Sequence, residues 1–186
     1  SVESISQDGE HTILVITEKV TSGPPYFVEL EHHQPANLDL TLKKHIEETV
    51  KRGLDALSIK NGASHSELKV NPEGVFLIEI GGRMGGDFIG SHLVQLSTGY
   101  DYLKNIIQVA LGHKIDVFKE ENYFFSGVYF LSKLTTYLLP FFENPFENSS
   151  LYIEKKLHTN DFKHLKDSSN RSGYIIYQSN SKLNLK

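Results

Sequence analysis

Alternating positions and β-branched runs predict strands near the start of the chain. Residues 2–6 alternate between apolar and polar side chains, Asp8-Gly9 favours a tight turn, and residues 11–19 are rich in β-branched side chains. Such a pattern predicts two paired strands. Residues 26–33 predict another strand.

A single amphipathic helix is predicted after residue 36. Asn37 or Asp39 can cap its start, because a short polar side chain can accept a hydrogen bond from the first turn. The apolar residues then recur every three or four positions, which gives one buried stripe. This stripe consists of Leu42, Ile46, Val50, Leu54 and Leu57.

The rest of the pattern completes an α+β fold. Residues 65–80 predict a hairpin, and residues 87–97 and 100–111 predict helices. The signal weakens beyond residue 112, where strands are predicted at 122–131, 150–157 and 173–179. We expect an antiparallel sheet with helices packed on one face, plus a smaller β-rich carboxy-terminal lobe. The domains would be residues 1–112 and 113–186.

Composition narrows the classes of function. The formal net charge of −4 gives no broad basic surface for nucleic acid, and no apolar run is long enough to span a bilayer. The absence of cysteine excludes disulfides and thiolate chemistry and fits a cytoplasmic protein. The opening SVESIS reads as the middle of a strand pair, so we expect the chain to be a fragment.

Two acids face each other in the predicted hairpin. A three-residue loop at Pro72-Glu73-Gly74 would place Asn71 opposite Val75, Lys69 opposite Leu77, and Glu67 opposite Glu79. One face would be charged and the other would pack on the helix stripe. The charged face would hold His65, Glu67, Lys69, Leu77 and Glu79, and the apolar face Ser66, Leu68, Val70, Phe76, Ile78 and Ile80.

Like charges directly across a sheet repel, so this pair needs an explanation. One acid could hold a proton, basic neighbours such as Lys69 or Arg83 could neutralise the pair, or Mg²⁺ could bridge it. From the hairpin alone, a metal site and a solvated polar face both remain open.

A glycine-rich loop follows the second acid. In GGRMGG, residues 81–86, four glycines allow a ligand close to the backbone, and Arg83 offers a charged fork to phosphate or carboxylate. The start of the next helix would offer free N–H groups to an anion. The sequence lacks the lysine of a P-loop and the spacing of a dinucleotide-binding loop. A simple tight turn into a helix is the structural alternative.

These residues resemble the carboxy-terminal half of the ATP-grasp superfamily. That family's metal motif is an acid on a strand, a second acid about a dozen residues later, and an arginine four residues beyond, here Glu67, Glu79 and Arg83. The following GGDFIG resembles the L-amino-acid ligase and carnosine-synthase-like branch. The weaker similarities are SVESISQDG (1–9), FVELEHHQPA (27–36) and NRSGYIIYQS (170–179).

The resemblance implies a role for each matching residue. Glu67 and Glu79 would hold Mg²⁺, or Mn²⁺ in its place, and so bind the phosphates of ATP. Arg83 would act in catalysis, on the phosphate of an acyl phosphate or on a substrate carboxylate. The Gly86 backbone would help to hold a substrate carboxylate. Glu29 and His32 would meet the substrate's amino group, with His33 as an equal candidate, although either histidine alone also fits a surface role.

The implied reaction is ATP-dependent joining of a carboxylate to an amine through an acyl phosphate. Its partners would be small-molecule carboxylates and amines and the amino-terminal half of the same enzyme, with neither nucleic acid nor membrane involved. A homodimer is left open. Without that half we expect no activity, and Gly81 stands where the family usually has a metal-binding asparagine. The alternatives are a non-catalytic nucleotide- or anion-binding module and a purely structural domain.

Overall fold

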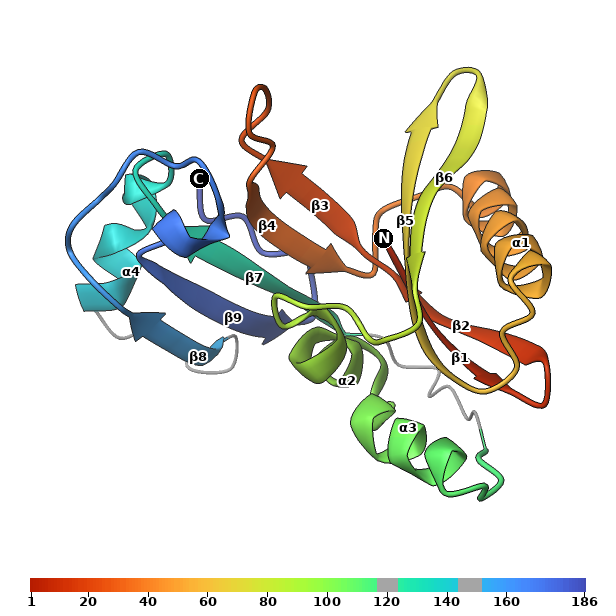
Figure 1. Cartoon of the computed structure of the whole chain (residues 1–186). Helices are drawn as coiled ribbons and strands as arrows, with labels where there is room; N and C mark the ends of the chain where they lie inside the picture. Colours follow the sequence, from red (N-terminus) through yellow and green to blue (C-terminus); the bar gives the residue numbers. More distant parts are fainter. Residues whose placement is uncertain (117–123, 144–151) are drawn as a thin grey trace. The chain divides into compact units, whose positions relative to one another are not determined.

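Two antiparallel sheets organise the chain (Figure 1). The computed structural model describes residues 1–116, 124–143 and 152–186. The first sheet has the strand order β2-β1-β5-β6 and the second β3-β4-β7-β9-β8. The strands are β1 (Val2–Gln7), β2 (Glu10–Ile16), β3 (Glu18–Thr21), β4 (Glu29–Gln34), β5 (Gly62–Asn71), β6 (Gly74–Gly81), β7 (Phe125–Leu131), β8 (Tyr152–Leu157) and β9 (Gly173–Ser179). The helices are α1 (Leu40–Ala56), α2 (Val94–Thr98), α3 (Tyr102–Ala110) and α4 (Leu139–Glu143), with a π-helix at Ile89–Leu93 and 3-10 turns at Thr136–Leu138 and Ser168–Asn170.

Contacts divide the chain into two units. Unit 1 comprises Ser1–Glu18 and Pro35–Tyr123, and unit 2 comprises Lys19–Gln34 and Phe124–Lys186. The sheet containing β1 lies in unit 1, whereas β4, β7, β8 and β9 lie in unit 2. The units are therefore interleaved along the sequence. The division into domains at residue 112 stays a prediction.

The strand predicted over residues 11–19 is two strands that belong to different sheets. β2 ends at Ile16 and β3 begins at Glu18. Between them, the Thr17 backbone exchanges hydrogen bonds with Ser1, with N–O distances of 2.7 and 2.9 Å. The β-branched pattern continues through this point, so local propensity alone could not show the change of sheet.

Helix α1 packs on the first sheet as its stripe predicts. Asp39 is the cap, and its side chain accepts a hydrogen bond from the Leu42 backbone N–H at 2.9 Å. Ile46, Val50 and Leu54 are buried in a cluster with side chains of β1 and β2. Leu57 is an error in the prediction, because the helix ends at Ala56 and the Leu57 side chain is exposed.

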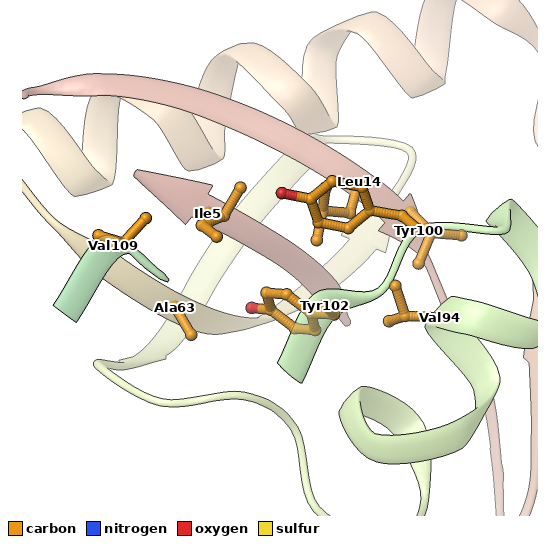
Figure 2. Close-up of a cluster of buried hydrophobic side chains, with 8 residues drawn as sticks. Ile5, Leu14, Ala63, Val94, Tyr100, Tyr102 and Val109 are labelled. Atoms are coloured by element: carbon orange, nitrogen blue, oxygen red, sulfur yellow. The ribbon is translucent and has the colours of Figure 1, made fainter. Parts of the chain in front are cut away.

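A second apolar cluster in unit 1 joins the strands to helices α2 and α3 (Figure 2). The cluster includes Ile5 of β1, Val94 of α2 and Val109 of α3. The buried Tyr102 hydroxyl donates a hydrogen bond to the Ser4 carbonyl at 2.7 Å. These contacts fix β1 firmly beneath the segment that follows the glycine loop.

The described parts confirm the α+β fold of antiparallel sheets with a few helices. The predicted helix at 100–111 is α3, and the strand at 173–179 is β9. The strands predicted at 122–131 and 150–157 are described as β7 and β8, and residues 122, 123, 150 and 151 lie outside the described residues. Among the described residues, no helix has the length and apolar character needed to cross a membrane.

Candidate functional site

The two predicted acids do face each other. Glu67 of β5 pairs directly with Glu79 of β6. The Glu67 side chain is 40% exposed, and Glu79 is exposed. Two carboxylates are thereby held opposite one another at the surface of an antiparallel ladder, where like charges oppose pairing.

The register that produces this pair differs from the predicted one near the turn. Asn71 pairs with Gly74 rather than Val75, so the loop has two residues, and Lys69 pairs with Phe76 rather than Leu77. The Asn71 side chain explains the tighter turn, since its Oδ1 accepts hydrogen bonds from the backbone N–H groups of Glu73 and Gly74 at 2.8 and 3.2 Å. A bulge next to Glu67 then restores the predicted pairing at the acids.

The bulge also changes the faces of β6. Phe76 and Ile78 were expected against the helix, but their side chains are 44% and 62% exposed. Leu77 was expected on the charged face, yet it approaches Gly53 of α1 together with Ile80. A Cβ atom at Gly53 would lie 2.7 Å from Leu77 Cδ2 and 2.9 Å from Ile80 Cδ1. Because β6 has one extra residue at the bulge, Leu77 and Ile80 both face helix α1 while Glu79 still faces Glu67.

A buried acid, Glu3, lies behind the pair and was missed by the sequence prediction. The Glu3 side chain is fully buried, and its Oε1 is hydrogen-bonded to His65 Nδ1. The other side of the His65 ring, Nε2, lies 3.4 Å from Glu67 Oε1. Burial, helped by the Glu3 charge, raises the pKa of the neighbouring Tyr102. An acid between the apolar residues Val2 and Ile5 was the signal that could have revealed this role.

Glu3 also anchors the glycine loop. Its Oε2 accepts a hydrogen bond from the Gly85 backbone N–H at 2.9 Å. A Cβ atom at Gly85 would lie 2.6 Å from Glu3 Oε1 and 2.8 Å from His65 Nδ1, closer than atoms can pack. A side chain at residue 85 would therefore displace Glu3 or His65, because the backbone passes against these two side chains.

The loop does not present the expected helix start to an anion. Asp87 and Phe88 adopt positive φ angles of 47° and 68°, and a π-helix rather than an α-helix follows. The backbone N–H groups of Ile89 and Gly90 donate to the Gly86 and Gly85 carbonyls. These two amides are thus already used. Consecutive left-handed conformations at non-glycine residues are sparsely populated and often occur at functional sites.

Arg83 is the exposed cation of this loop. Its guanidinium donates a hydrogen bond to the Met84 carbonyl at 2.9 Å. Arg83 follows Glu79 by four residues at the end of β6, so the chain carries an acid pair and a permanently charged group on adjoining segments.

The predicted substrate residues Glu29 and His32 lie in unit 2. Glu29 forms ion pairs with Arg171 at 3.1 Å and with Lys19 at 3.4 Å. His32 is buried and packs edge-on against Phe130.

His33, the alternative to His32, is also buried and belongs to a polar network. Its two ring nitrogens are hydrogen-bonded to Glu31 at 3.0 Å and to the Tyr177 hydroxyl at 2.8 Å. The surface role considered for either histidine is therefore wrong. Burial disfavours the Glu31 charge, but hydrogen bonds from His33 and Lys186 outweigh it and lower the pKa of Glu31 to about 2.

The acid pair fits a hard cation that shares its ligands with a nucleotide. Among the residues that the structure describes, no group of three or more His, Cys, Asp or Glu side chains could hold a metal alone. Mg²⁺ commonly uses only one or two carboxylates and completes its shell with waters and substrate phosphates. Glu67 and Glu79 would supply this donor set if such an ion bound here.

Comparison with known proteins places this site in a family. The ATP-grasp domain matches residues 1–91, which include Glu67, Glu79, Arg83 and Gly86. No curated protein sequence matches the chain. Residues 1–91 of this chain thus match the ATP-grasp family, as the resemblance predicted.

Solved structures agree on the fold. The L-amino acid ligase from Bacillus licheniformis is similar with a TM-score of 0.76 and 21% identity, over 97% of this chain and 48% of that one. Phosphoribosylglycinamide synthetase from Anaerococcus prevotii gives a TM-score of 0.72 and 18% identity, over 97% and 47%. Biotin carboxylase from Campylobacter jejuni gives 0.64 and 15%, over 97% and 41%. The chain thus spans about half the length of these proteins or less.

Proposed function

We propose that this chain is the carboxy-terminal half of an ATP-dependent carboxylate–amine ligase that acts on amino acids through an acyl phosphate. The direct pairing of Glu67 with Glu79 carries the proposal, because two surface carboxylates held face to face need a counter-charge. The family match and the similarity to an L-amino acid ligase support the reaction class.

The residues of unit 1 would act by positioning and charge neutralisation. Glu67 and Glu79 would hold Mg²⁺, or Mn²⁺ in its place, and the bound ion would neutralise the phosphates of ATP. Arg83 would offer its guanidinium to the transferred phosphate or to a substrate carboxylate. The Gly86 backbone would help to hold the carboxylate, and the anchored Gly85 keeps that segment in place.

In unit 2, Glu29 and His32 would meet the amino group of the substrate. Glu29 already pairs with Arg171 and Lys19, so an incoming ammonium would compete with these two cations. The partners we propose are a small carboxylate, an amine and the amino-terminal half of the enzyme. The absence of cysteine fits a cytoplasmic enzyme.

The test uses a longer protein with the chain's natural upstream sequence restored. We expect ADP release when ATP, Mg²⁺ and mixed amino acids are present, and none from the 186-residue chain alone. Glu79→Gln should abolish release while circular dichroism and melting stay unchanged. ATP binding without turnover in the longer protein would favour the alternative of a nucleotide-binding module.

A further inference from the structure

The metal acid Glu67 is the end of a chain of side chains that begins in the core of unit 1. Glu3 of β1 is fully buried, the His65 side chain is 7% exposed, and the Glu67 side chain is 40% exposed. Contacts link Glu3 to His65 Nδ1 and His65 Nε2 to Glu67 Oε1, the latter at 3.4 Å. The exposed fraction of these side chains thus rises step by step from the buried Glu3 to the surface carboxylate of Glu67.

We propose that Glu3 and His65 are positioning residues that hold Glu67 in place for the cation, an inference that rests on the function proposed above. A glutamate side chain at the surface of a strand can adopt several rotamers, and binding a metal ion restricts it to one of them at a cost in entropy. The imidazole restricts one Glu67 oxygen, and the buried Glu3 restricts the imidazole. Partners of this kind behind a metal ligand typically change metal affinity by about 10–100-fold.

The same Glu3 carboxylate also holds the glycine loop that carries Arg83. Its second oxygen accepts the Gly85 N–H at 2.9 Å, two residues after Arg83. One buried group therefore fixes both the metal acid on β5 and the loop that carries the arginine. The close approach at Gly85, where a Cβ atom would meet both Glu3 and His65, shows how tightly the three segments are packed.

A purely structural role for the Glu3–His65 pair predicts a different outcome for one substitution. In His65→Asn, the amide nitrogen can occupy the place of Nδ1 and keep the hydrogen bond to Glu3, but nothing replaces Nε2 next to Glu67. Stability should then stay near that of the wild type, while the restraint on Glu67 is lost.

The experiment titrates the ¹⁵N-labelled chain with Mn²⁺ and follows paramagnetic broadening of amides near residues 67 and 79. We expect His65→Asn to weaken Mn²⁺ binding about tenfold with little change in melting temperature. If His65→Asn does not fold, His65→Gln replaces it, since glutamine can reach Glu67 but no longer connects it to Glu3, and its binding should also weaken.

Glu79→Gln separates failure of this inference from failure of the proposed function. If Glu79→Gln weakens Mn²⁺ binding but folded His65→Asn, or its replacement His65→Gln, binds like the wild type, the positioning role is overturned and the metal site stands. If Glu79→Gln leaves the broadening unchanged, the metal site itself, and with it the proposed function, is wrong.

Discussion

The β5–β6 hairpin of unit 1 and strand β4 of unit 2 both carry acids beside histidines, but they use them differently. On β4, Glu31 is 4% exposed and is already bound by His33, Tyr137 and Lys186. On the hairpin, Glu67 and Glu79 face each other at the surface. A buried acid with its counter-charges serves the fold, whereas we propose that the acid pair at the surface holds a cation. The partners of a charged residue, rather than its presence, therefore indicate its role.

We expect the largest loss of stability from a substitution in the buried Glu31 network of β4. Glu31→Gln removes the acid at the centre of a buried network with His33 and Tyr137, so the free energy of unfolding should fall by about 3 kcal/mol. Glu79→Gln, at an exposed position, should change it by no more than ~0.5 kcal/mol. Urea denaturation of the two variants side by side measures this difference, and equal losses would contradict the distinction between the regions.

The pH dependence of stability tests whether the buried Glu31 is ionised in the folded protein. The pKa of Glu31 is about 2 in the folded protein, below the ordinary value of 4.5, because the effect of burial is outweighed by hydrogen bonds from His33 and Lys186. A depressed pKa stabilises the fold above the unfolded pKa, and this contribution is lost as pH falls through the folded pKa. The stability difference between wild type and Glu31→Gln should therefore be full above pH ~5 and shrink toward pH ~2. A difference that stays constant over this range would contradict the ionised buried network.

An intermediate effect concerns the anchored loop. Gly85→Ala forces a methyl group against Glu3 and His65 and should cost about 1–3 kcal/mol of stability. Gly86→Ala is the matched control, because a Cβ atom there meets nothing within 4 Å. Thermal unfolding of both variants checks the prediction. Equal melting temperatures for the two alanine variants would show that Glu3 does not hold the loop closely.

We expect the smallest effect, a gain in Mn²⁺ affinity, from a substitution at Gly81. A Cβ atom at this position would have its nearest neighbour, Arg83 Cγ, at an ordinary 3.6 Å, so the Cβ atom introduced by Gly81→Asn displaces nothing. Asparagine would restore the metal ligand that the ATP-grasp resemblance leads one to expect there. We predict a gain in Mn²⁺ affinity of up to about tenfold, roughly 1.4 kcal/mol, by paramagnetic titration. Weaker binding would indicate that the cation lies away from β6.

The sequence predicted the elements whose signal is local and periodic. The α1 stripe from Leu42 to Leu54 and the pairing of Glu67 with Glu79 were read correctly. The sequence pattern does not predict the bulge, because the packing of Leu77 and Ile80 near Gly53 joins residues that are distant in the chain. The predicted three-residue turn is wrong because the Asn71 side chain accepts a hydrogen bond from the Glu73 N–H and stabilises a shorter loop.

The candidate site was only partly predictable for a similar reason. Glu79 and Arg83 lie in one recognisable motif, but Glu3 acts on Gly85 across 82 positions of sequence. Its role depends on β1 pairing with β5, which places His65 opposite Glu3. The burial of His32 and His33 likewise depends on strands β7 and β9, which follow almost a hundred residues or more later in the chain.

The most direct test of the account measures Mn²⁺ binding to the chain and to two single variants, Glu79→Gln and Glu31→Gln. Paramagnetic broadening in the wild type should centre on residues 67 and 79. It should be lost in Glu79→Gln, which stays as stable as the wild type, and be retained in Glu31→Gln, which is less stable. Unchanged broadening in Glu79→Gln would contradict the claim that the paired hairpin acids form the metal site.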